Sequence, residues 1–300
     1  NLKLRASWGR LGNENALGYY DFLALISTYN TKYQGYVKGN GDNAWAGSIA
    51  RGLENRSLKW ETTDTKNIGL DFGFFNNKLT GAMNYYYNQT EELLITKALP
   101  PSAGLNNPIL NVGKIRNSGV EVEINWADSK GGFDYNIGMN FSTTKNKVVE
   151  LADKGQVLYG EGLKYGTEHF PTQTRVGKPI GAFYLYKTNG LFQSNEEARQ
   201  YVNADGDEYQ PFADAGDIRF VDVNGDGSID DDDKVYCGSG IPTLEVNLNF
   251  SAGYKGFDLS VVLGSAWGHK IYNGNKYFYE GMNSGSNFLT SSLNLSLIHI

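Results

Sequence analysis

The densest group of potential ligand side chains lies in one acidic stretch, DVNGDGSIDDDD at residues 222–233. Its spacing matches the twelve-residue EF-hand calcium loop, in which oxygen atoms at set positions surround the ion and a glycine at position 6 allows a sharp turn. Gly227 occupies that position, and we predict that Ca2+ orders the loop. The candidate calcium ligands are Asp222, Asn224, Asp226, the backbone carbonyl of Ser228, Asp230 and Asp233.

The acidic stretch departs from the calcium pattern in two ways. Asp233 stands where a bidentate Glu is usual, so its carboxylate reaches less far toward an ion. No amphipathic helices flank the loop, which disfavours a calcium sensor. The alternative is a solvated acidic turn, or a loop rich in Asp and Asn that is folded by its own hydrogen bonds. Ca2+ is the one cofactor that the sequence suggests.

Carboxylates outside that loop could also do chemistry. Asp71, Glu121, Glu123 and Asp134 fall on the polar sides of alternating segments and could meet in one interior. Paired carboxylates can act as general acid and base, but acids that line a wet channel explain the same pattern. The sequence has no G-x-S-x-G elbow, phosphate loop or metalloprotease helix. We therefore predict that the protein is not an enzyme.

Composition narrows the remaining functions. A net charge of -6 provides no basic surface for nucleic acid, and three His far apart in sequence disfavour a His-bound metal. One cysteine, Cys237, excludes an intrachain disulfide. With 37 Gly, 20 Tyr and only 7 Pro, the composition is typical of a β protein.

The elements that would position these residues are β-strands, seen most clearly at residues 244–268. Apolar and polar residues alternate up to the Lys255-Gly256 turn and again after it, which predicts two strands. Each arm has about ten residues, the length that a tilted strand needs to cross a bilayer. The apolar residues of the first arm are Leu244, Val246, Leu248, Phe250, Ala252 and Tyr254.

The same alternation recurs in residues 2–8, 68–74, 79–87, 120–126 and 133–141. About seven spanning strands are therefore predicted in total. Tight turns join them at one end and long connections at the other, as in membrane barrels with short periplasmic turns and long extracellular loops.

The long connections are predicted at residues 10–65, 89–118 and 145–242. Because neighbouring strands run antiparallel, an even number of spanning strands, or none, lies within the last connection. The segment GAFYLY at residues 181–186 lacks clean alternation, and we place it in a loop hairpin with residues 190–193.

These strands predict an all-β fold, an antiparallel transmembrane β-barrel. A β-sandwich with one wet face is the alternative. The polar sides of the strands carry mostly Asn, Ser and Gly, and Tyr254 and Phe257 flank a tight turn, as aromatic girdles do in membrane barrels. Seven strands cannot close a transporter barrel of ~22 strands, so we predict a partial barrel with long extracellular loops.

Several strings resemble the SusC/RagA family of TonB-dependent (TonB-linked) outer-membrane transporters, and they follow one another along nearly the whole chain. They are LKLRASWGRLGN at 2–13, LKWETTDTKNIGLDFGFFNNKLTGAMNYYYNQTEELL at 58–94, NVGKIRNSGVEVEINW at 111–126, GKPIGAFYLYKTNGLFQS at 177–194, GDIRFVDVNGDGSIDDDDKVYCGSGIP at 216–242 and YKGFDLSVVL at 254–263.

The resemblance implies that residues 1–292 are the C-terminal portion of a TonB-dependent receptor β-barrel. A plug and a TonB box would precede this chain, and residues 145–242 would form an extracellular region that contains the acidic loop 222–233. The last residues, LNLSLIHI at 293–300, do not resemble the family's continuation, and we expect them to be a truncation artefact.

The resemblance also implies a function. Family members import oligosaccharides or peptides across the outer membrane of Bacteroidota, with a SusD-like lipoprotein as a lid and TonB as the energy source. We expect oligosaccharides first and peptides second as substrates, membrane lipid around the strands, and no nucleic acid. The alternatives are a calcium-ordered extracellular β module and a passive porin.

Overall fold

The computed structural model describes residues 1–15, 17–24, 26–29, 36–37, 44–45, 47–50, 52–97, 99, 101–160, 163–165, 167–275 and 279. The expectation for residues 293–300 lies outside the described residues. Two compact units are present, one formed by Asn1–Gln156 with Leu244–Ser265 and the other by Val157–Thr243 with Ala266–Ile300.

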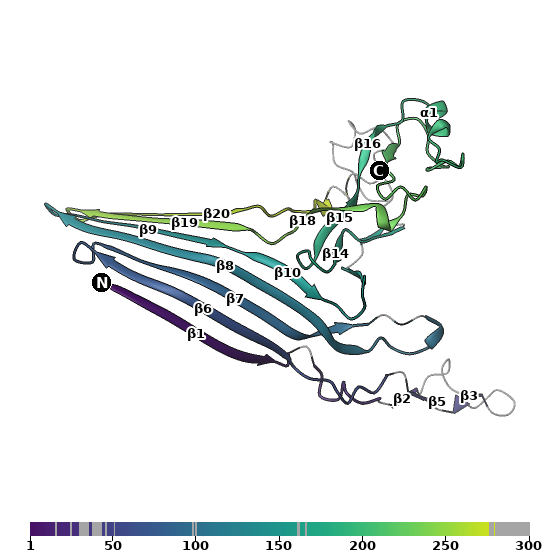
Figure 1. The fold of residues 1–300 in the computed structure, drawn as a ribbon, viewed down its shortest axis with the longest axis horizontal. Helices are drawn as coiled ribbons and strands as arrows, with labels where there is room; N and C mark the ends of the chain where they lie inside the picture. Colours follow the sequence, from purple (N-terminus) through teal and green to yellow (C-terminus); the bar gives the residue numbers. More distant parts are fainter. Residues whose placement is uncertain are drawn as a thin grey trace. The chain divides into compact units, whose positions relative to one another are not determined.

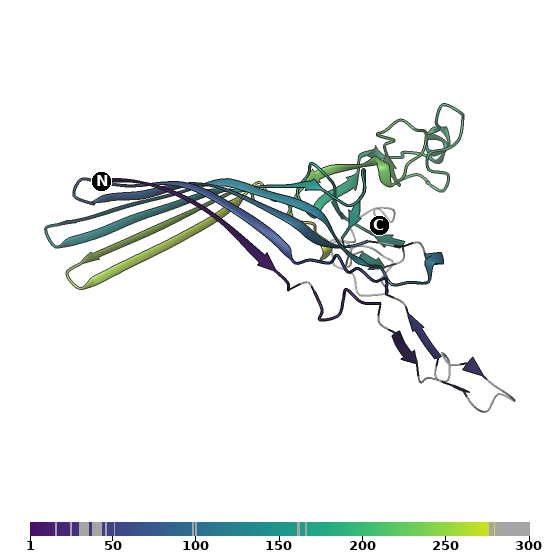
Figure 2. The same ribbon diagram turned by 60° about the horizontal axis from the view of Figure 1, so that its bottom comes forward.

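The main part of the first unit is one antiparallel sheet of long strands (Figures 1 and 2). Its strand order is β1-β6-β7-β8-β9-β19-β20, which confirms the seven predicted strands and the partial barrel. None of the described strands between β10 and β19 joins this sheet, so the predicted parity holds. The bounds are β1 Leu2–Asn13, β6 Glu61–Phe74, β7 Leu79–Thr96, β8 Ile109–Lys130, β9 Phe133–Thr143, β10 Lys145–Glu150, β19 Leu244–Tyr254 and β20 Phe257–Trp267.

The register brings the apolar residues of all these strands to one side of the sheet. Directly opposed residues form a row across six strands, made of Leu4, Leu70, Met83, Val122, Phe141 and Val246. Many apolar side chains on this side are uncovered by protein; Leu4 is 81% exposed and Ile68 64%. A sheet with an uncovered apolar side is suited to contact with lipid, and this favours the barrel over the sandwich.

Left-handed backbone conformations make the tight turns at one end of the sheet. Lys255 and Gly256 have φ of 48° and 86°, and Asn76 and Asn77 have φ of 56° and 66°. At Lys255-Gly256 they match the right-handed twist of the flanking strands, as a two-residue hairpin turn requires, and at residues 75–78 they form the four-residue connection between β6 and β7. Aromatic residues gather beside the turns, where the rings of Phe133 and Tyr254 lie 6.3 Å apart.

Two predicted loop boundaries are wrong, because the strands extend further than their alternation indicates. β7 continues to Thr96 and β8 begins at Ile109, so residues 97–108 connect them rather than 89–118. Likewise, residues 14–60, rather than 10–65, separate β1 from β6. Beyond the apolar rows, charged cross-strand pairs replace apolar contacts, as for Arg10 with Asp64 at 2.6 Å and Lys114 with Glu91 at 3.1 Å.

The predicted connection 145–242 also begins too early. β10 continues the pairing of β9 along β8 in the same register, with Ser142 opposite Glu121 and Lys145 opposite Ser118. β9 and β10 therefore act as one strand with a local break at Thr144.

The second unit consists of short strands. The predicted hairpin of residues 181–186 with 190–193 is wrong, because a hairpin needs about two turn residues and only Lys187 separates the two strands. β15 instead pairs with β14 and β18, and β16 with β17. The bounds are β11 Leu158–Tyr159, β12 Leu163–Tyr165, β13 Thr167–His169, β14 Thr172–Thr174, β15 Ala182–Tyr186, β16 Thr188–Leu191, β17 Ile218–Phe220 and β18 Lys234–Gly238.

Among the described residues, helices are few and short. α1 (Asn195–Gln200) is capped by Ser194, and Ala198 packs with Phe192 and Ala213 in a small core. No helix in the described part of the chain is long and apolar enough to span a membrane. The remaining elements are the 3-10 turns η1 (Pro101–Ala103) and η2 (Asp231–Asp233) and the strands β2 (Ile26–Tyr29), β3 (Tyr36–Val37), β4 (Ala44–Trp45) and β5 (Gly47–Ala50).

A glycine permits the junction between β9 and β10. A Cβ at Gly119 would collide with the carbonyl oxygen of Thr143, which also accepts a 3.1 Å hydrogen bond from the Tyr86 hydroxyl. We expect Gly119→Ala to lower the stability of the barrel by about 1–3 kcal/mol, the usual cost of overpacking. The effect is measured on SDS gels, as a decrease in the temperature at which the barrel loses the migration of its folded form. Gly9→Ala is the control, since a Cβ there meets nothing within 4 Å; equal stability of the two variants would contradict the prediction.

Candidate functional site: the polar wall of the sheet and the acidic loop

The side of the sheet opposite the apolar rows is a continuous polar wall. One row across six strands consists of Lys3, Asp71, Ala82, Glu123, Asn140 and Asn247. The next row toward the loops brings Arg5, Gly69, Asn84, Glu121, Ser142 and Glu245 together. Arg5 links strands within this wall, because its guanidinium donates to Asp71 at 2.7 Å and to Asn84 at 2.9 Å.

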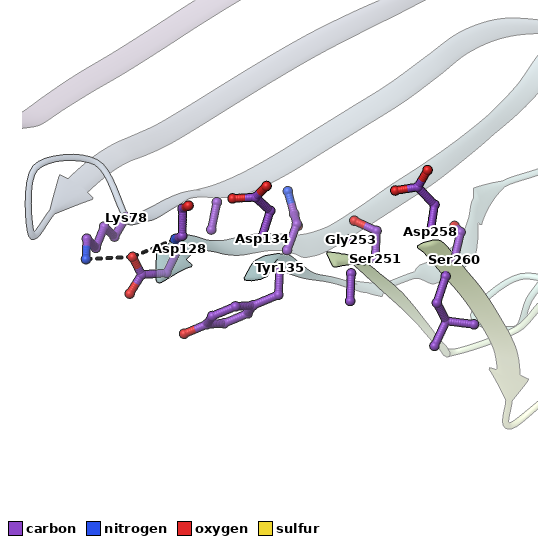
Figure 3. Close-up of a pocket in the computed structure, with 13 residues that line it drawn as sticks. Lys78, Asp128, Asp134, Tyr135, Ser251, Gly253, Asp258 and Ser260 are labelled. Carbon is purple, nitrogen blue, oxygen red and sulfur yellow. Dashed lines mark hydrogen bonds and ion pairs between the residues drawn. The ribbon is translucent and has the colours of Figure 1, made fainter. Parts of the chain in front are cut away.

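Grooves in the first unit mark where this wall is hollowed. A groove of about 850 Å³ lies beside the tight turns, and Figure 3 shows the carboxylates of Asp134 and Asp258 on one side of the sheet with the Tyr135 ring on the other. Two smaller hollows, of about 400 and 200 Å³, share Glu123 and Asn140. Amides, hydroxyls and carboxylates line these hollows together with apolar residues such as Ile124, Phe141 and Leu259.

The structure brings some of the predicted carboxylates together but not all. Glu121 and Glu123 lie on one side of β8, and Asp71 shares the row of Glu123 two strands away. Asp71 forms an ion pair with Arg5 at 2.7 Å. Asp134 lies farther along, opposite Ser129 near the turn. This arrangement suits the hydrated wall of a channel.

Sequence reasoning missed two charged features near the turns. Lys78 and Asp128 form an ion pair at 2.6 Å, drawn as a dashed line in Figure 3, and Asp258 lines the same groove as Asp134. Their only signal in the sequence is a position next to a turn. Register alone decides which of them meet.

The acidic loop is folded by its own hydrogen bonds. The Asp222 carboxylate accepts from the backbone N–H of Gly225 at 2.6 Å and of Gly227 at 2.9 Å. Asn224 and Asp226 accept from backbone N–H groups two residues ahead, at 2.9 Å each. Such short hydrogen bonds from Asp and Asn side chains to nearby backbone N–H groups are expected if the loop is folded by its own hydrogen bonds, which is the alternative to ordering by calcium.

Asp233 is the buried centre of the loop. Its side chain is fully buried, and it accepts backbone N–H bonds from Val223 at 2.7 Å, Asn224 at 3.3 Å and Asp230 at 2.9 Å. Burial raises the pKa of the Asp233 carboxyl, but the three N–H donors outweigh burial and hold that pKa below its usual value. The predicted position-12 ligand thus serves as the internal acceptor of the loop.

Residues that lie outside the acidic loop hold it in place through Asp231. Its carboxylate forms an ion pair with Lys234 at 2.6 Å and accepts from the Tyr186 hydroxyl at 3.2 Å. Burial and the neighbouring Asp231 raise the pKa of Tyr186 to about 12, so its hydroxyl stays a donor. Within the described residues, no group of three or more His, Cys, Asp or Glu side chains is placed to hold a metal ion. Calcium binding at the six candidate ligands stays a prediction.

The family follows from a comparison with known proteins. A family model described as "TonB dependent receptor-like, beta-barrel" matches residues 1–261. This chain belongs to the TonB-dependent receptor β-barrel family. It is similar to receptors of the SusC/RagA type, which are outer-membrane proteins of Bacteroidota, and the resemblance inferred from the sequence is confirmed.

Relatives of the receptor support this assignment. TonB-dependent receptor P3 of Formosa agariphila is 30% identical over 90% of this chain and 26% of its own length. TonB-dependent receptor SusC of Bacteroides thetaiotaomicron is 28% identical over 98% of this chain and 27% of its own length. A structure of the RagAB peptide importer in the closed-closed state matches 95% of this chain and 29% of its own, with a TM-score of 0.70 and 22% identity. The chain thus spans about a quarter of the length of the curated relatives it matches.

The role of Asp233 predicts a local stability effect. In Asp233→Asn, an NH2 group must face at least one of the three backbone N–H donors, so we expect a loss of about 1–3 kcal/mol in local stability. Because the folded pKa is lowered, the wild-type contribution is present above about pH 4 and is lost as the pH falls below it. Hydrogen exchange at residues 222–233 measures both effects.

Asp232→Asn is the matched control, since Asp232 is exposed and only its backbone N–H bonds within the loop. Exchange that is unchanged in Asp233→Asn, or equally fast in both variants, would show that the buried carboxylate does not hold the loop.

Proposed function

We propose that this receptor barrel is the C-terminal part of a TonB-energised importer of nutrients, with oligosaccharides as the first candidate substrates and peptides as the second. The observation that supports this proposal most directly is the polar wall on one side of the sheet, opposite the apolar rows. A wall of this kind encloses a hydrated path when such a sheet closes into a barrel.

The chemistry of the wall favours hydroxyl-rich substrates. Asn84, Asn140 and Asn247 supply both donors and acceptors, and Glu121 and Glu123 supply strong acceptors. Sugar hydroxyl groups both donate and accept hydrogen bonds, so they match a mixed wall. Peptide amides match it too, which keeps peptides as the second candidate.

A SusD-like surface lipoprotein is the proposed partner at the loop end, and TonB the proposed partner through a region outside this chain. SusC and the RagAB importer are the relatives that motivate this pairing. The long connections at residues 14–60, 97–108 and 151–243 are the proposed contact and specificity segments.

Deleting the TonB box of the full-length protein tests energised import. We expect uptake of labelled oligosaccharides to collapse to the background of cells without the gene, because an importer of this type needs TonB to open its path. Uptake that survives the deletion would make the barrel a passive porin.

The sheet offers a matched pair of variants for the path itself. Asn140 lines two hollows of the polar wall, and its neighbour Met139 lies on the apolar side of the sheet, opposite Ile124. We expect Asn140→Trp to slow uptake and Met139→Trp to leave it unchanged. The reverse result would mean that the path does not follow this wall.

We propose Ca2+ as an ordering ion for residues 222–233. With about 1 mM Ca2+, a concentration suited to extracellular sites, hydrogen exchange of this loop in the intact protein should be slower than in EDTA. Asp226→Ala should abolish that difference, whereas the control Asp232→Ala should retain it. Equal exchange and equal thermal stability in both buffers would contradict calcium binding.

A further inference from the structure

The apolar side of the sheet ends abruptly toward the loops. Its last apolar row contains Ala6, Ile68, Tyr85 and Val120. From Leu79 at the turn end to Tyr85 in this last row, β7 covers about 20 Å along the strand, or roughly 16 Å across the membrane at a ~40° tilt. The next two rows follow on β7 at Tyr87 and Gln89, roughly 21 and 26 Å across the membrane from Leu79. Because the apolar band of outer-membrane barrels is ~25 Å tall, these two rows lie at its outer edge, at the level of the outer-leaflet headgroups.

Those rows are basic, and we call the next two rows the outer basic rows. The first contains Trp8, Lys66, Tyr87, Ser118 and Lys145. The second contains Arg10, Asp64, Gln89, Arg116 and Lys147. Five cations thus face one carboxylate on the lipid side of the sheet.

Most of this positive charge is not neutralised by the protein. Arg10 is paired with Asp64 at 2.6 Å, and in the row beyond, Lys114 is paired with Glu91 at 3.1 Å. Among the described residues, no acidic side chain forms an ion pair with Lys66, Lys145, Lys147 or Arg116. Three of these four, the lysines, are exposed. The cluster therefore has a net charge available for an external anion.

Aromatic rings fix the height and direction of these cations. Lys66 Nζ lies 5.8 Å from the centre of the Tyr87 ring, and Arg116 Cζ lies 5.1 Å from it. Arg116 donates to Gln89 at 3.3 Å, and its Nε has no hydrogen-bond partner among the described residues. Tyr and Trp favour the membrane interface, and Trp8 is 68% exposed in the same row.

We propose that the outer basic rows bind the phosphate groups of a phosphorylated outer-leaflet lipid, with the acyl chains lying along the apolar rows below. Basic residues at a membrane surface attract anionic headgroups, and Arg suits phosphate oxygens because its donors are arranged as a fork. An acidic protein would have to displace the surrounding headgroups to reach the same surface, so lipid is the occupant that this position favours.

Lipid binding by the purified full-length protein in neutral detergent micelles tests the proposal by native mass spectrometry. The probes are bisphosphorylated lipid A, the same lipid A without phosphates, and inorganic phosphate. We expect the phosphorylated lipid to bind about tenfold more tightly than the dephosphorylated one, and inorganic phosphate to compete poorly because it lacks acyl chains. This comparison needs no variant, and it does not depend on whether the protein imports anything.

The triple variant Lys66→Gln, Arg116→Gln, Lys147→Gln should bind the phosphorylated lipid about tenfold more weakly. The matched control is Lys3→Gln, Lys130→Gln, Lys255→Gln, which removes the same charge from the polar wall and from the turn end, and it should keep wild-type affinity.

Four results would overturn the proposal. One is equal affinity for the two forms of lipid A, and a second is an equal loss in both triple variants. The third is complete displacement of the lipid by millimolar inorganic phosphate, which would indicate an anion site that does not recognise lipid. A triple variant that keeps its lipid but no longer copurifies with a surface lipoprotein would likewise assign the rows to a protein partner.

Discussion

Backbone N–H and C=O groups have no water to bond with in hydrocarbon, so a membrane-spanning sheet must pair them strand to strand. In this receptor barrel each long strand pairs with its neighbour in the order β1-β6-β7-β8-β9-β19-β20, and tight turns join neighbouring strands at one end. Because side chains alternate between the two sides of the sheet, the register of this pairing also decides which side chains face lipid and which face the polar side. A slip of one residue in any strand would place its polar residues in lipid and its apolar residues in the path.

The ladder continues past the membrane, and the interactions that support it change along the strands. Aromatic residues surround the tight turns, apolar rows follow, and charged pairs such as Arg10 with Asp64 hold the outer ends. Along their length, the same strands therefore contact the lipid chains with their apolar rows and the lipid headgroups with their outer basic rows, and their outer ends carry the loops. Gly119 allows this continuity where β9 meets β10, because the carbonyl of Thr143 occupies the space of a side chain.

The second unit is stabilised differently. Its strands are short and its core around Phe192 is small, so polar interactions carry much of its order. Asp233 gathers three backbone N–H groups inside the acidic loop, and Asp231 ties the loop to Lys234 and Tyr186. The loop can therefore keep one shape through hydrogen bonds, and an ion bound there would act on a loop that is already organised.

The sequence by itself determined which segments form strands and which side of each strand is apolar, because period-two alternation is local and is strongest where one side meets lipid. It also identified the tight turns at Asn76-Asn77 and Lys255-Gly256 and the family strings. Only the tertiary structure decided where the strands end, how β15 pairs, that Lys66 and Arg116 flank one tyrosine, and that Asp233 is buried. Those features depend on partners distant in sequence, and alternation vanishes where charged pairs replace apolar contacts outside the membrane.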